Sequence, residues 1–413
     1  LEEAWGRDPE EKSPSSRFFG LIRRAYQAAN RRVVVLIDEY DKPLTDTLGN
    51  PELHSQIRER LQGFYSVLKA SDQWLRFVFL TGVTKFSKVS IFSTLNHLRD
   101  ISMSVDYAGI CGITQSELDR YFGPEIQAMA EKEQKTGAEI VEELRKRYDG
   151  YHFTRGENSP LSEGTYNPFS LLNTFANRNF SYYWFQTGTP TFLVDLLKRT
   201  NFDLRDLSGS IPIDQQSIED YRPENPNPAP LFYQTGYLTI KDYRERYDQF
   251  ILGFPNEEVK YGFLKALLPE YAPKVQHEQG LLISRFIDDL EAGDLEAFMT
   301  RVKVFFAHIP YDLYDDTERC YQSFLYVLFT LMGEYTQAEV RSSAGRADLV
   351  VTTDTTVFCF EFKLAGNGTV EDALKQIDDK GYLVPYGVSD RALVKVGAVF
   401  DAATRTLGAW KTG

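Results

Sequence analysis

The alternation of side chains over residues 357–364, near the C-terminal end, constrains the fold of this chain more than any other pattern in it. Phenylalanine or leucine stands at every second position, and the positions between them hold Val357, Cys359, Glu361 and Lys363. Successive side chains of a β-strand point to opposite faces of its sheet, so a period of two predicts a strand. We expect one face to be core and the other to carry a site with a carboxylate and an ammonium group.

A second strand is predicted immediately before this one, over residues 348–351. The polar residues 352–356 separate the two strands, and a short polar stretch between apolar runs is typical of a hairpin. Folding the chain back at this stretch sets Asp348 roughly opposite Glu361. Two carboxylates and the ammonium group of Lys363 then converge.

These three groups match what a hydrolytic metal site requires. A hard cation such as Mg²⁺ takes oxygen ligands, usually one or two carboxylates, with water and substrate phosphate in the other positions. Asp348 and Glu361 fit that need, and Lys363 would orient a water or stabilise charge on phosphate oxygens. The alternative is a solvated polar strand face with a weak cross-strand pair, which needs no metal.

Four further elements are expected around these two strands: a helix over 317–332, a strand over 336–341, a helix over 370–382 and a strand over 392–400. The first helix carries Glu318 at its start, and the second carries Gln376. Glu318 could equally be a first-turn carboxylate that interacts with the helix dipole. Gln376 could equally be an ordinary surface residue of a helix.

The order helix, three strands, helix, strand resembles the core of the PD-(D/E)XK nuclease superfamily, a restriction-endonuclease-like α/β fold. The strings Gly345-Arg346-Ala347-Asp348 and Glu361-Phe362-Lys363 resemble that superfamily too. They are similar to the branch found behind AAA-ATPase-like domains in bacteria. The resemblance implies nucleic acid as substrate, with DNA favoured over RNA although the sequence does not decide between them, and Mg²⁺ or Mn²⁺ held by Asp348 and Glu361. It implies these catalytic residues: Glu318, Asp348, Glu361, Lys363 and Gln376.

Charge limits how such a chain would hold nucleic acid. The net charge is −13, and residues 281–413 contain 13 Lys and Arg against 20 Asp and Glu. Tight nonspecific binding to DNA is driven by Lys and Arg that release counterions. A local field can still guide substrate to a narrow site. We therefore expect a weakly bound or partner-delivered nucleic acid.

Near the other end, an amphipathic helix over 16–30 leads to five consecutive apolar residues, 33–37, followed by Asp38 and Glu39. An uninterrupted apolar run of this length predicts a buried parallel strand. The carboxyl ends of such strands are where α/β folds bind ligands. The pattern resembles a Walker B motif, in which Asp38 would hold Mg²⁺ and Glu39 would polarise the attacking water.

The next apolar strand, over 75–80, ends in a polar tip with Thr81 and Thr84, which resembles the strand that senses the γ-phosphate of ATP. The phosphate loop that should accompany it, Gly-x-x-x-x-Gly-Lys-[Ser/Thr], is absent, because none of the 28 glycines is followed by lysine. ATP is thus expected as a cofactor only if that loop is present. Since the chain begins at Leu1 rather than Met, the expected explanation is a fragment whose first strand and phosphate loop lie upstream or were not resolved.

Several further strings resemble the AAA-ATPase-like family of Bacteroides-type bacteria, over most of residues 33–197. They include Phe86-Ser87-Lys88, Tyr148-Asp149-Gly150-Tyr151 and Tyr166-Asn167-Pro168-Phe169-Ser170. Arg99 is a candidate arginine finger, which would require a homo-oligomer. The alternative is an ordinary surface ion pair with Asp100.

The middle of the chain predicts a linker and a small module. Residues 211–230 carry five prolines, which favours an extended linker or an exposed arm. A helix and a strand turning at Gly236, a strand over 249–253 and a further helix resemble a winged helix, expected to act as a lid rather than to bind DNA. The predicted domains are residues 1–200 (AAA-ATPase-like, without its Walker A segment), 201–279 (linker and lid) and 280–413 (nuclease-like).

Composition excludes some classes of protein. No apolar run approaches the roughly 18 residues that a membrane span needs, so we expect no membrane association and a cytoplasmic protein. Three cysteines far apart indicate neither a disulfide framework nor a zinc site.

The function predicted from these patterns is a metal-dependent nuclease coupled to an ATPase-like regulatory domain. The alternative is a non-cutting regulatory or scaffold ATPase-like protein, whose nuclease-like domain binds nucleic acid or protein. A free-standing ATPase is the weakest option, because the phosphate loop is missing.

Overall fold

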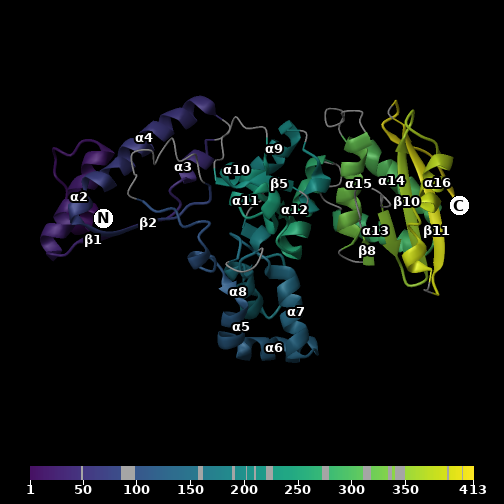
Figure 1. The fold of residues 1–413 in the computed structure, drawn as a ribbon, viewed down its shortest axis with the longest axis horizontal. Helices are drawn as coiled ribbons and strands as arrows, with labels where there is room; N and C mark the ends of the chain where they lie inside the picture. Colours follow the sequence, from purple (N-terminus) through teal and green to yellow (C-terminus); the bar gives the residue numbers. More distant parts are fainter. Residues whose placement is uncertain are drawn as a thin grey trace. The chain divides into compact units, whose positions relative to one another are not determined.

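The computed structural model describes residues 1–47, 50–84, 98–156, 161–187, 191–200, 202–208, 211–219, 227–271, 279–309, 318–333, 337–339, 349–387, 390–401 and 403–413. Helices and strands are mixed along the whole chain, as an α/β fold requires (Figure 1). The chain forms two compact units, each built from several stretches of sequence. The first unit is Leu1–Gly112, Tyr151–Gly164 and Ile211–Leu252, and the second is Ile113–Gly150, Thr165–Ser210 and Gly253–Gly413. The predicted boundaries at 200 and 279 remain a prediction.

The first unit begins with a parallel strand pair. Strand β1 (Val33–Ile37) lies beside β2 (Leu75–Leu80), with Ile37 opposite Leu80. Helix α2 (Pro14–Ala29) starts at a capping box made by Ser13 and Ser16, which satisfies orphan backbone donors of its first turn. The other helices of this region are α1 (Glu2–Trp5), α3 (Lys42–Thr45) and α4 (Pro51–Ala70).

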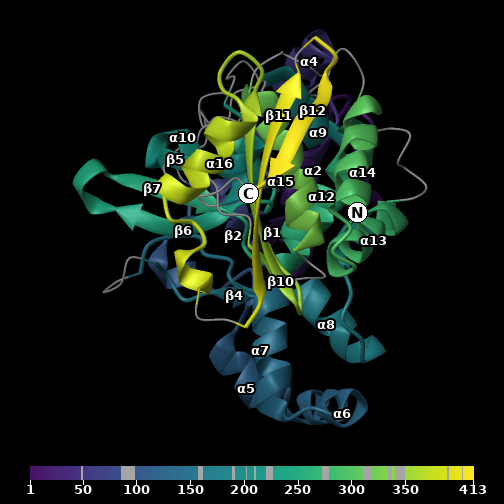
Figure 2. The same ribbon diagram turned by 90° about the vertical axis from the view of Figure 1, so that its right-hand side faces the viewer.

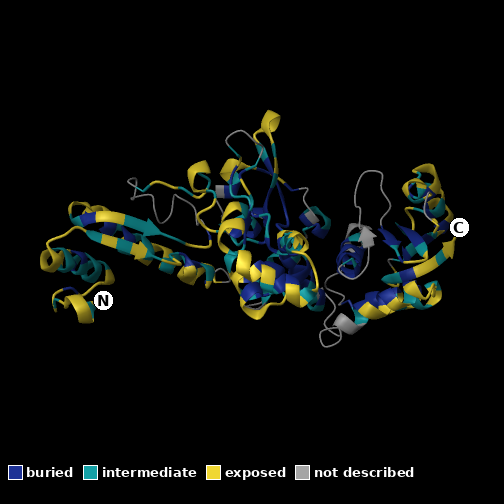
Figure 3. Ribbon diagram, turned by 90° about the horizontal axis from the view of Figure 1, so that it is seen from below, coloured by how far each residue is buried: buried dark blue, intermediate teal, exposed yellow. Residues whose placement is uncertain are grey.

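The expectation of a fully buried strand over 33–37 is wrong. Burial alternates along β1 between intermediate and exposed residues (Figure 3). Val34 and Leu36 are 50% and 69% exposed. In the described part of the chain, β1 and β2 form a sheet of two strands only. Such a small sheet can bury one face while the other stays open, so an apolar run does not by itself imply burial on both faces.

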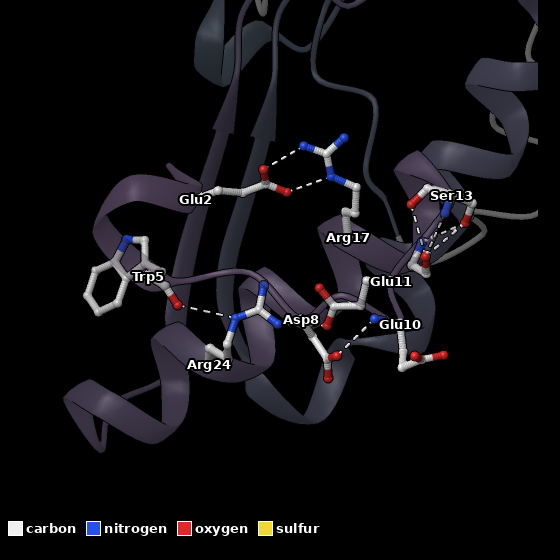
Figure 4. A network of polar contacts seen from close by, with 9 residues as sticks. Glu2, Trp5, Asp8, Glu10, Glu11, Ser13, Arg17 and Arg24 are labelled. Atoms are coloured by element: carbon white, nitrogen blue, oxygen red, sulfur yellow. Dashed lines mark hydrogen bonds and ion pairs between the residues drawn. The ribbon is translucent and has the colours of Figure 1, made fainter.

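A polar network ties the N-terminal segment to α2 (Figure 4). Arg17 donates hydrogen bonds from two guanidinium nitrogens to the carboxylate of Glu2, with 2.6 Å between Nε and Oε1. Arg24 holds Glu11 at 2.6 Å and also donates to the carbonyl of Trp5. A fork of guanidinium donors matched to a carboxylate fixes geometry better than a single contact does. The segment before α2 is therefore anchored along that helix.

The first unit contains a second sheet of three strands, in the order β5-β7-β6. Its members are β5 (Ile211–Asp214), β6 (Thr239–Arg244) and β7 (Gln249–Gly253), accompanied by helices α10 (Gln215–Glu219) and α11 (Ala229–Gln234). The expectation of a linker over 211–230 is wrong where the structure describes it. Ile211 and Ile213 are buried and alternate with Pro212 and Asp214, which is strand periodicity despite the proline.

The turn at Gly236 is confirmed, with a φ of 82° that favours glycine. It joins α11 to β6 as the sequence predicts. Helix α12 (Glu257–Tyr271), the next element of the expected module, falls in the second compact unit. The winged-helix assignment stays a prediction.

The second unit has a helical part and a sheet part. The helical part surrounds a core that includes Leu118, Met129, Ile140, Leu144, Tyr148, Tyr166 and Leu171. Its elements are β3 (Ile113–Thr114), α5 (Gln115–Tyr121), α6 (Gly123–Glu133), α7 (Gly137–Tyr148), β4 (Thr165–Tyr166), α8 (Pro168–Asn177) and α9 (Thr191–Thr200). Asn167 caps α8, and Pro168 stands in its first turn, where its missing N–H costs nothing.

The sheet part has five strands in the order β12-β11-β10-β9-β8. The strands are β8 (Gln337–Glu339), β9 (Leu349–Thr352), β10 (Thr356–Leu364), β11 (Ala392–Asp401) and β12 (Thr406–Thr412). The helices are α13 (Gln279–Glu291), α14 (Leu295–Ala307), α15 (Glu318–Met332) and α16 (Val370–Asp379). The predicted order from α15 to β11 is confirmed, and β12 was not predicted.

Helices cover both faces of this sheet, with α14 on one side and α16 on the other (Figure 2). The aromatic side chains of β10 pack toward α14 and α15: Phe360 lies 5.3 Å from Phe298 between ring centroids, and Phe362 lies 6.0 Å from Phe329. The opposite side chains of β10 pack with Ile377 of α16. The predicted alternation is correct, but the face expected to carry the site is covered as well.

In the described ranges, no helix combines the length and apolar character needed to cross a bilayer.

Candidate functional site

Strand β10 places Glu361 and Lys363 on the sheet face that α16 covers. The strand is central: it pairs antiparallel with β9 and parallel with β11. Glu361 is only 2% exposed, and Lys363 Nζ lies 3.0 Å from Glu361 Oε1. A carboxylate this deep must be compensated by hydrogen bonds or charge, because desolvating it alone costs several kcal/mol.

Gln376 of α16 adds to the compensation at Glu361 Oε1. Lys363 Nζ donates to Gln376 Oε1 at 2.7 Å, and Gln376 Nε2 donates to Glu361 Oε1. The three side chains therefore form a closed ring of contacts, with the amide bridging ammonium and carboxylate. The same Nε2 also donates to the hydroxyl of Tyr382, at 3.3 Å.

Local sequence explains why α16 lies close enough for this. Its first turn is fixed by a capping box between Thr369 and Asp372. Backbone hydrogen bonding from Thr369 lowers the pKa of Asp372, and nearby lysines add to the effect. The preceding Gly368 leaves room for the stem of Lys363, because a Cβ there would lie 3.2 Å from Lys363 Cγ.

Gly397 of β11 is the second close approach. It stands opposite Glu361 in the strand register. A Cβ on Gly397 would lie 2.7 Å from the carbonyl oxygen of Val370 and 2.9 Å from Leu374 Cγ. Real Cβ contacts are not that short, so only glycine lets α16 pack at this depth against the sheet.

The side chains of two predicted site residues, Asp348 and Glu318, are not described. Residues 345–348, and with them Asp348, lie outside the described residues, and α15 begins at Glu318 without a described side chain. The register of the hairpin ends with Leu349 opposite Phe360. That is the register that the prediction of Asp348 opposite Glu361 requires.

Among the described residues, no three or more His, Cys, Asp or Glu side chains are grouped so as to hold a metal ion. No sequence pattern predicted a role for Tyr382, Gly368 or Gly397. The string Lys380-Gly381-Tyr382, which follows α16 directly, was the available signal for the first of these.

At the other predicted site, the structure brings Asp38 and Thr81 together. The Thr81 hydroxyl donates to Asp38 Oδ1, at the carboxyl ends of β1 and β2. The N–H of Glu39 donates to the same carboxylate oxygen at 3.0 Å, and Glu39 has a φ of 51°, which is uncommon for a residue other than glycine. Thr84 does not join this group, because Asp41 binds it.

Asp41, for which the sequence predicted no role, holds the segment after β2 in place by hydrogen bonds. Its carboxylate is 1% exposed and accepts the N–H of Val83 at 3.0 Å, and both the N–H and the hydroxyl of Thr84, the latter at 2.6 Å. The Tyr40 hydroxyl donates to the Thr84 carbonyl at 2.8 Å, and burial raises the pKa of Tyr40 far above its ordinary value. This arrangement requires glycine at 82, where a Cβ would lie 2.4 Å from Asp41 Oδ1.

Replacing Asp41 by alanine is expected to destabilise this part of the chain by about 2–6 kcal/mol. The substitution leaves the buried N–H and hydroxyl of Thr84 without their acceptor, and each such loss costs about 1–3 kcal/mol. Hydrogen exchange of the Thr84 amide, compared between the wild type and Asp41→Ala, would measure the effect. Asp46→Ala is the matched control, because Asp46 forms an exposed ion pair with Lys42. Equal exchange in the two variants would show that these hydrogen bonds are unimportant.

Arg99, the candidate finger, is 70% exposed and lies 4.0 Å from Asp106, beside the ring of Tyr107. Its role stays a prediction.

Comparison with known proteins supports the division of the chain into unlike ends. Residues 1–92 match the family described as predicted AAA-ATPase, and residues 316–410 match the PD-(D/E)XK nuclease superfamily. A relative from Azotobacter chroococcum mcd 1, described as an uncharacterized protein in the vnfD 5′ region, is 37% identical over 416 residues. The match covers 98% of this chain and 76% of that relative. No solved structure matches.

Proposed function

Because this chain belongs to one family with the Azotobacter chroococcum protein and joins a predicted AAA-ATPase domain to a PD-(D/E)XK nuclease superfamily domain, we propose that it is a metal-dependent nuclease. The reaction is hydrolysis of phosphodiester bonds in nucleic acid, DNA in preference to RNA. The ATPase-like end would regulate it.

The observation that carries this proposal is the ring formed by Glu361, Lys363 and Gln376 on a central strand and its covering helix. Glu361 is 2% exposed, and burying its carboxylate is costly. An apolar side chain at that position would stabilise the strand face more simply. Three polar side chains from two elements instead converge there. A catalytic arrangement needs side chains that hold one another in place by hydrogen bonds, and this ring supplies such bonds.

The proposed donor set suits a divalent cation, because both of its members are carboxylates. Glu361 would supply a buried carboxylate oxygen, and Asp348, which lies outside the described residues, is proposed to supply the second. Glu361 and Asp348 are therefore the proposed ligands, with Mg²⁺ or Mn²⁺ as the ion. A cation held there would neutralise charge on a phosphate oxygen and make a water more acidic.

The remaining steps belong to the side chains of the chain itself. Lys363, 16% exposed, presents an ammonium group at the rim of the buried cluster, where it would bind a phosphate oxygen or orient the attacking water. Gln376 holds that ammonium group by its carbonyl oxygen. Glu318, at the start of α15, is proposed as an additional carboxylate of the same site.

For the ATPase-like end we propose a nucleotide-linked regulatory role. Asp38 would hold Mg²⁺ and Glu39 a water, with Thr81 and Thr84 near the phosphates. The contact between Thr81 and Asp38 supports part of that set, whereas Thr84 is bound by Asp41. ATP serves as a cofactor only together with a phosphate loop. The acidic balance of residues 281–413 favours a weakly held or partner-delivered nucleic acid.

Metal dependence is the first test. The wild-type protein is expected to nick supercoiled plasmid in Mg²⁺ or Mn²⁺, to lose that activity in excess EDTA, and to regain it when the cation is restored, because the cation is proposed to make the attacking water more acidic and to neutralise charge on the phosphate. Gel electrophoresis of the plasmid would measure the nicking. Cleavage that is insensitive to EDTA would contradict the proposal.

The second candidate is a regulatory or scaffold protein whose nuclease-like domain binds without cutting. The excess of acidic residues in 281–413 favours this second function, because negative charge weakens the binding of nucleic acid that cleavage requires. Calorimetry distinguishes the two functions. A non-cutting domain should show no binding of Mn²⁺ that depends on Glu361.

A further inference from the structure

Helix α16 ends in a turn that returns the chain to the candidate site. Gly381 has a φ of 62°, its N–H donates to the carbonyl of Asp378 at 3.0 Å, and the N–H of Tyr382 donates to the carbonyl of Ile377 at 3.2 Å. This pair of bonds around a left-handed glycine is the Schellman motif, which often brings a hydrophobic contact between its last residue and the helix. Here Tyr382 and Ile377 belong to one buried cluster.

The motif fixes where the tyrosine ring goes. Tyr382 is 9% exposed, and its hydroxyl accepts a hydrogen bond from Gln376 Nε2, one turn before the helix end. A side chain at position 381 would meet Val384 Cγ2 at 3.2 Å and would strain the left-handed backbone. Glycine followed by tyrosine therefore directs a hydroxyl group at the amide of the site.

We propose that Tyr382 is a positioning residue: its hydroxyl holds the Gln376 amide in the orientation that keeps Lys363 in place. The nuclease role of this ring rests on the function proposed above, but the positioning of the amide does not.

The orientation of an amide is decided by its partners. Gln376 has one acceptor oxygen, which takes the Lys363 proton, and one nitrogen with two protons. Those two protons reach Glu361 and Tyr382. Turning the amide by 180° would set its nitrogen against the ammonium group and its oxygen against the carboxylate. The tyrosine hydroxyl adds a partner that accepts from the nitrogen.

The tyrosine matters most when Glu361 takes another partner. Glu361 is a proposed metal ligand, whereas Tyr382 is not, so the contact with Tyr382 is the one that a bound cation would leave intact. With it, Gln376 Oε1 continues to face Lys363. Without it, the amide loses a fixed partner at the moment when the ammonium group must meet a phosphate.

The first test needs no cation and no substrate. In the full chain labelled with ¹⁵N-glutamine, the side-chain amide signal of Gln376 is assigned by its loss in Gln376→Met. Tyr382→Phe, which keeps the ring, is expected to shift that signal. Tyr243→Phe is the control: it also removes a hydrogen-bonded hydroxyl, which donates to Asp248 in the β6–β7 hairpin. An unshifted Gln376 signal in Tyr382→Phe would overturn the proposal.

The second test is a double-mutant cycle on cleavage rate. Tyr382→Phe is expected to lower kcat about 3- to 10-fold with little change in KM, the range for one hydrogen bond. In a Gln376→Ala background the same change should have almost no effect on kcat, because the side-chain amide through which Tyr382 acts is absent. Equal losses in both backgrounds would overturn the proposal. If the wild type does not cut, the proposed function fails, and the amide signal alone decides the positioning.

Discussion

Replacing Glu361 by glutamine is expected to lower phosphodiester cleavage by about 10²- to 10³-fold, a loss comparable with that of one electrostatic stabiliser in other hydrolytic sites. Glutamine has the shape of glutamate without its charge. The variant therefore keeps the packing under α16, where Glu361 is 2% exposed, while it removes the proposed ligand and the ion pair with Lys363. Cation binding should weaken with it, because hard cations prefer carboxylate oxygens.

The matched control is Glu371→Gln. Glu371 also pairs with a lysine of the same sheet part, Lys411, but both side chains are 64% exposed. An exposed pair contributes little, so this variant should bind Mn²⁺ as the wild type does. Isothermal titration of Mn²⁺ into the three proteins measures the difference. Equal binding by Glu361→Gln and Glu371→Gln would favour the non-cutting alternative.

The second large effect is expected at Gly397. Gly397→Val would place a Cβ 2.7 Å from the Val370 carbonyl oxygen and add two methyl groups beside Leu374. Overpacking of this kind costs about 3 kcal/mol, and the backbone of α16 has to move to relieve it. Gln376 travels with the helix, so the variant should lose both stability in the sheet part and its cleavage activity.

Hydrogen exchange of amides in α16 would measure that loss, because it reports the stability of one element in a chain with more than one unit. Gly387→Val is the control, since Gly387 is exposed and its nearest neighbour, the Val384 carbonyl oxygen, would lie at an ordinary 3.5 Å from a Cβ. Unchanged exchange in Gly397→Val would show that the close approach of α16 does not set the geometry of the site.

Strand β10 was predictable because its information is local. A period of two assigns Glu361 and Lys363 to one face, and the length of the turn over 352–356 sets the register with β9. The order of elements from α15 to β11 follows from the same kind of pattern. Gln376 could be placed on a helix, but its contact with Lys363 depends on where that helix packs.

What covers a face was not predictable, because it depends on residues far along the chain. Glu361 is buried since α16 comes close, and α16 comes close since position 397 is glycine. A glycine in a predicted strand does not indicate which helix will pack against the space that its missing side chain leaves. The same limit explains β1, where the apolar run did not reveal that Leu36 would be exposed.

Residues 211–214 and Asp41 show two other limits. Prolines favoured a linker at 211–230, although Ile211 and Ile213 alternate as a strand does, and the tertiary pairing with β7 decided the outcome. Asp41 comes shortly after the acidic residues Asp38 and Glu39 in the sequence. The local sequence does not distinguish a carboxylate that binds a metal ion from one that accepts hydrogen bonds from backbone N–H groups. Only the position of Thr84, brought near by β2, makes that distinction.

The most direct test of the nuclease site is the rate at which the wild type and Glu361→Gln nick the same supercoiled plasmid in Mn²⁺, measured side by side from one purification procedure. A site built on Glu361, Lys363 and Gln376 predicts clear nicking by the wild type and a rate at least about 100-fold lower for the variant. Equal rates would contradict it, because the cleavage would then come from elsewhere.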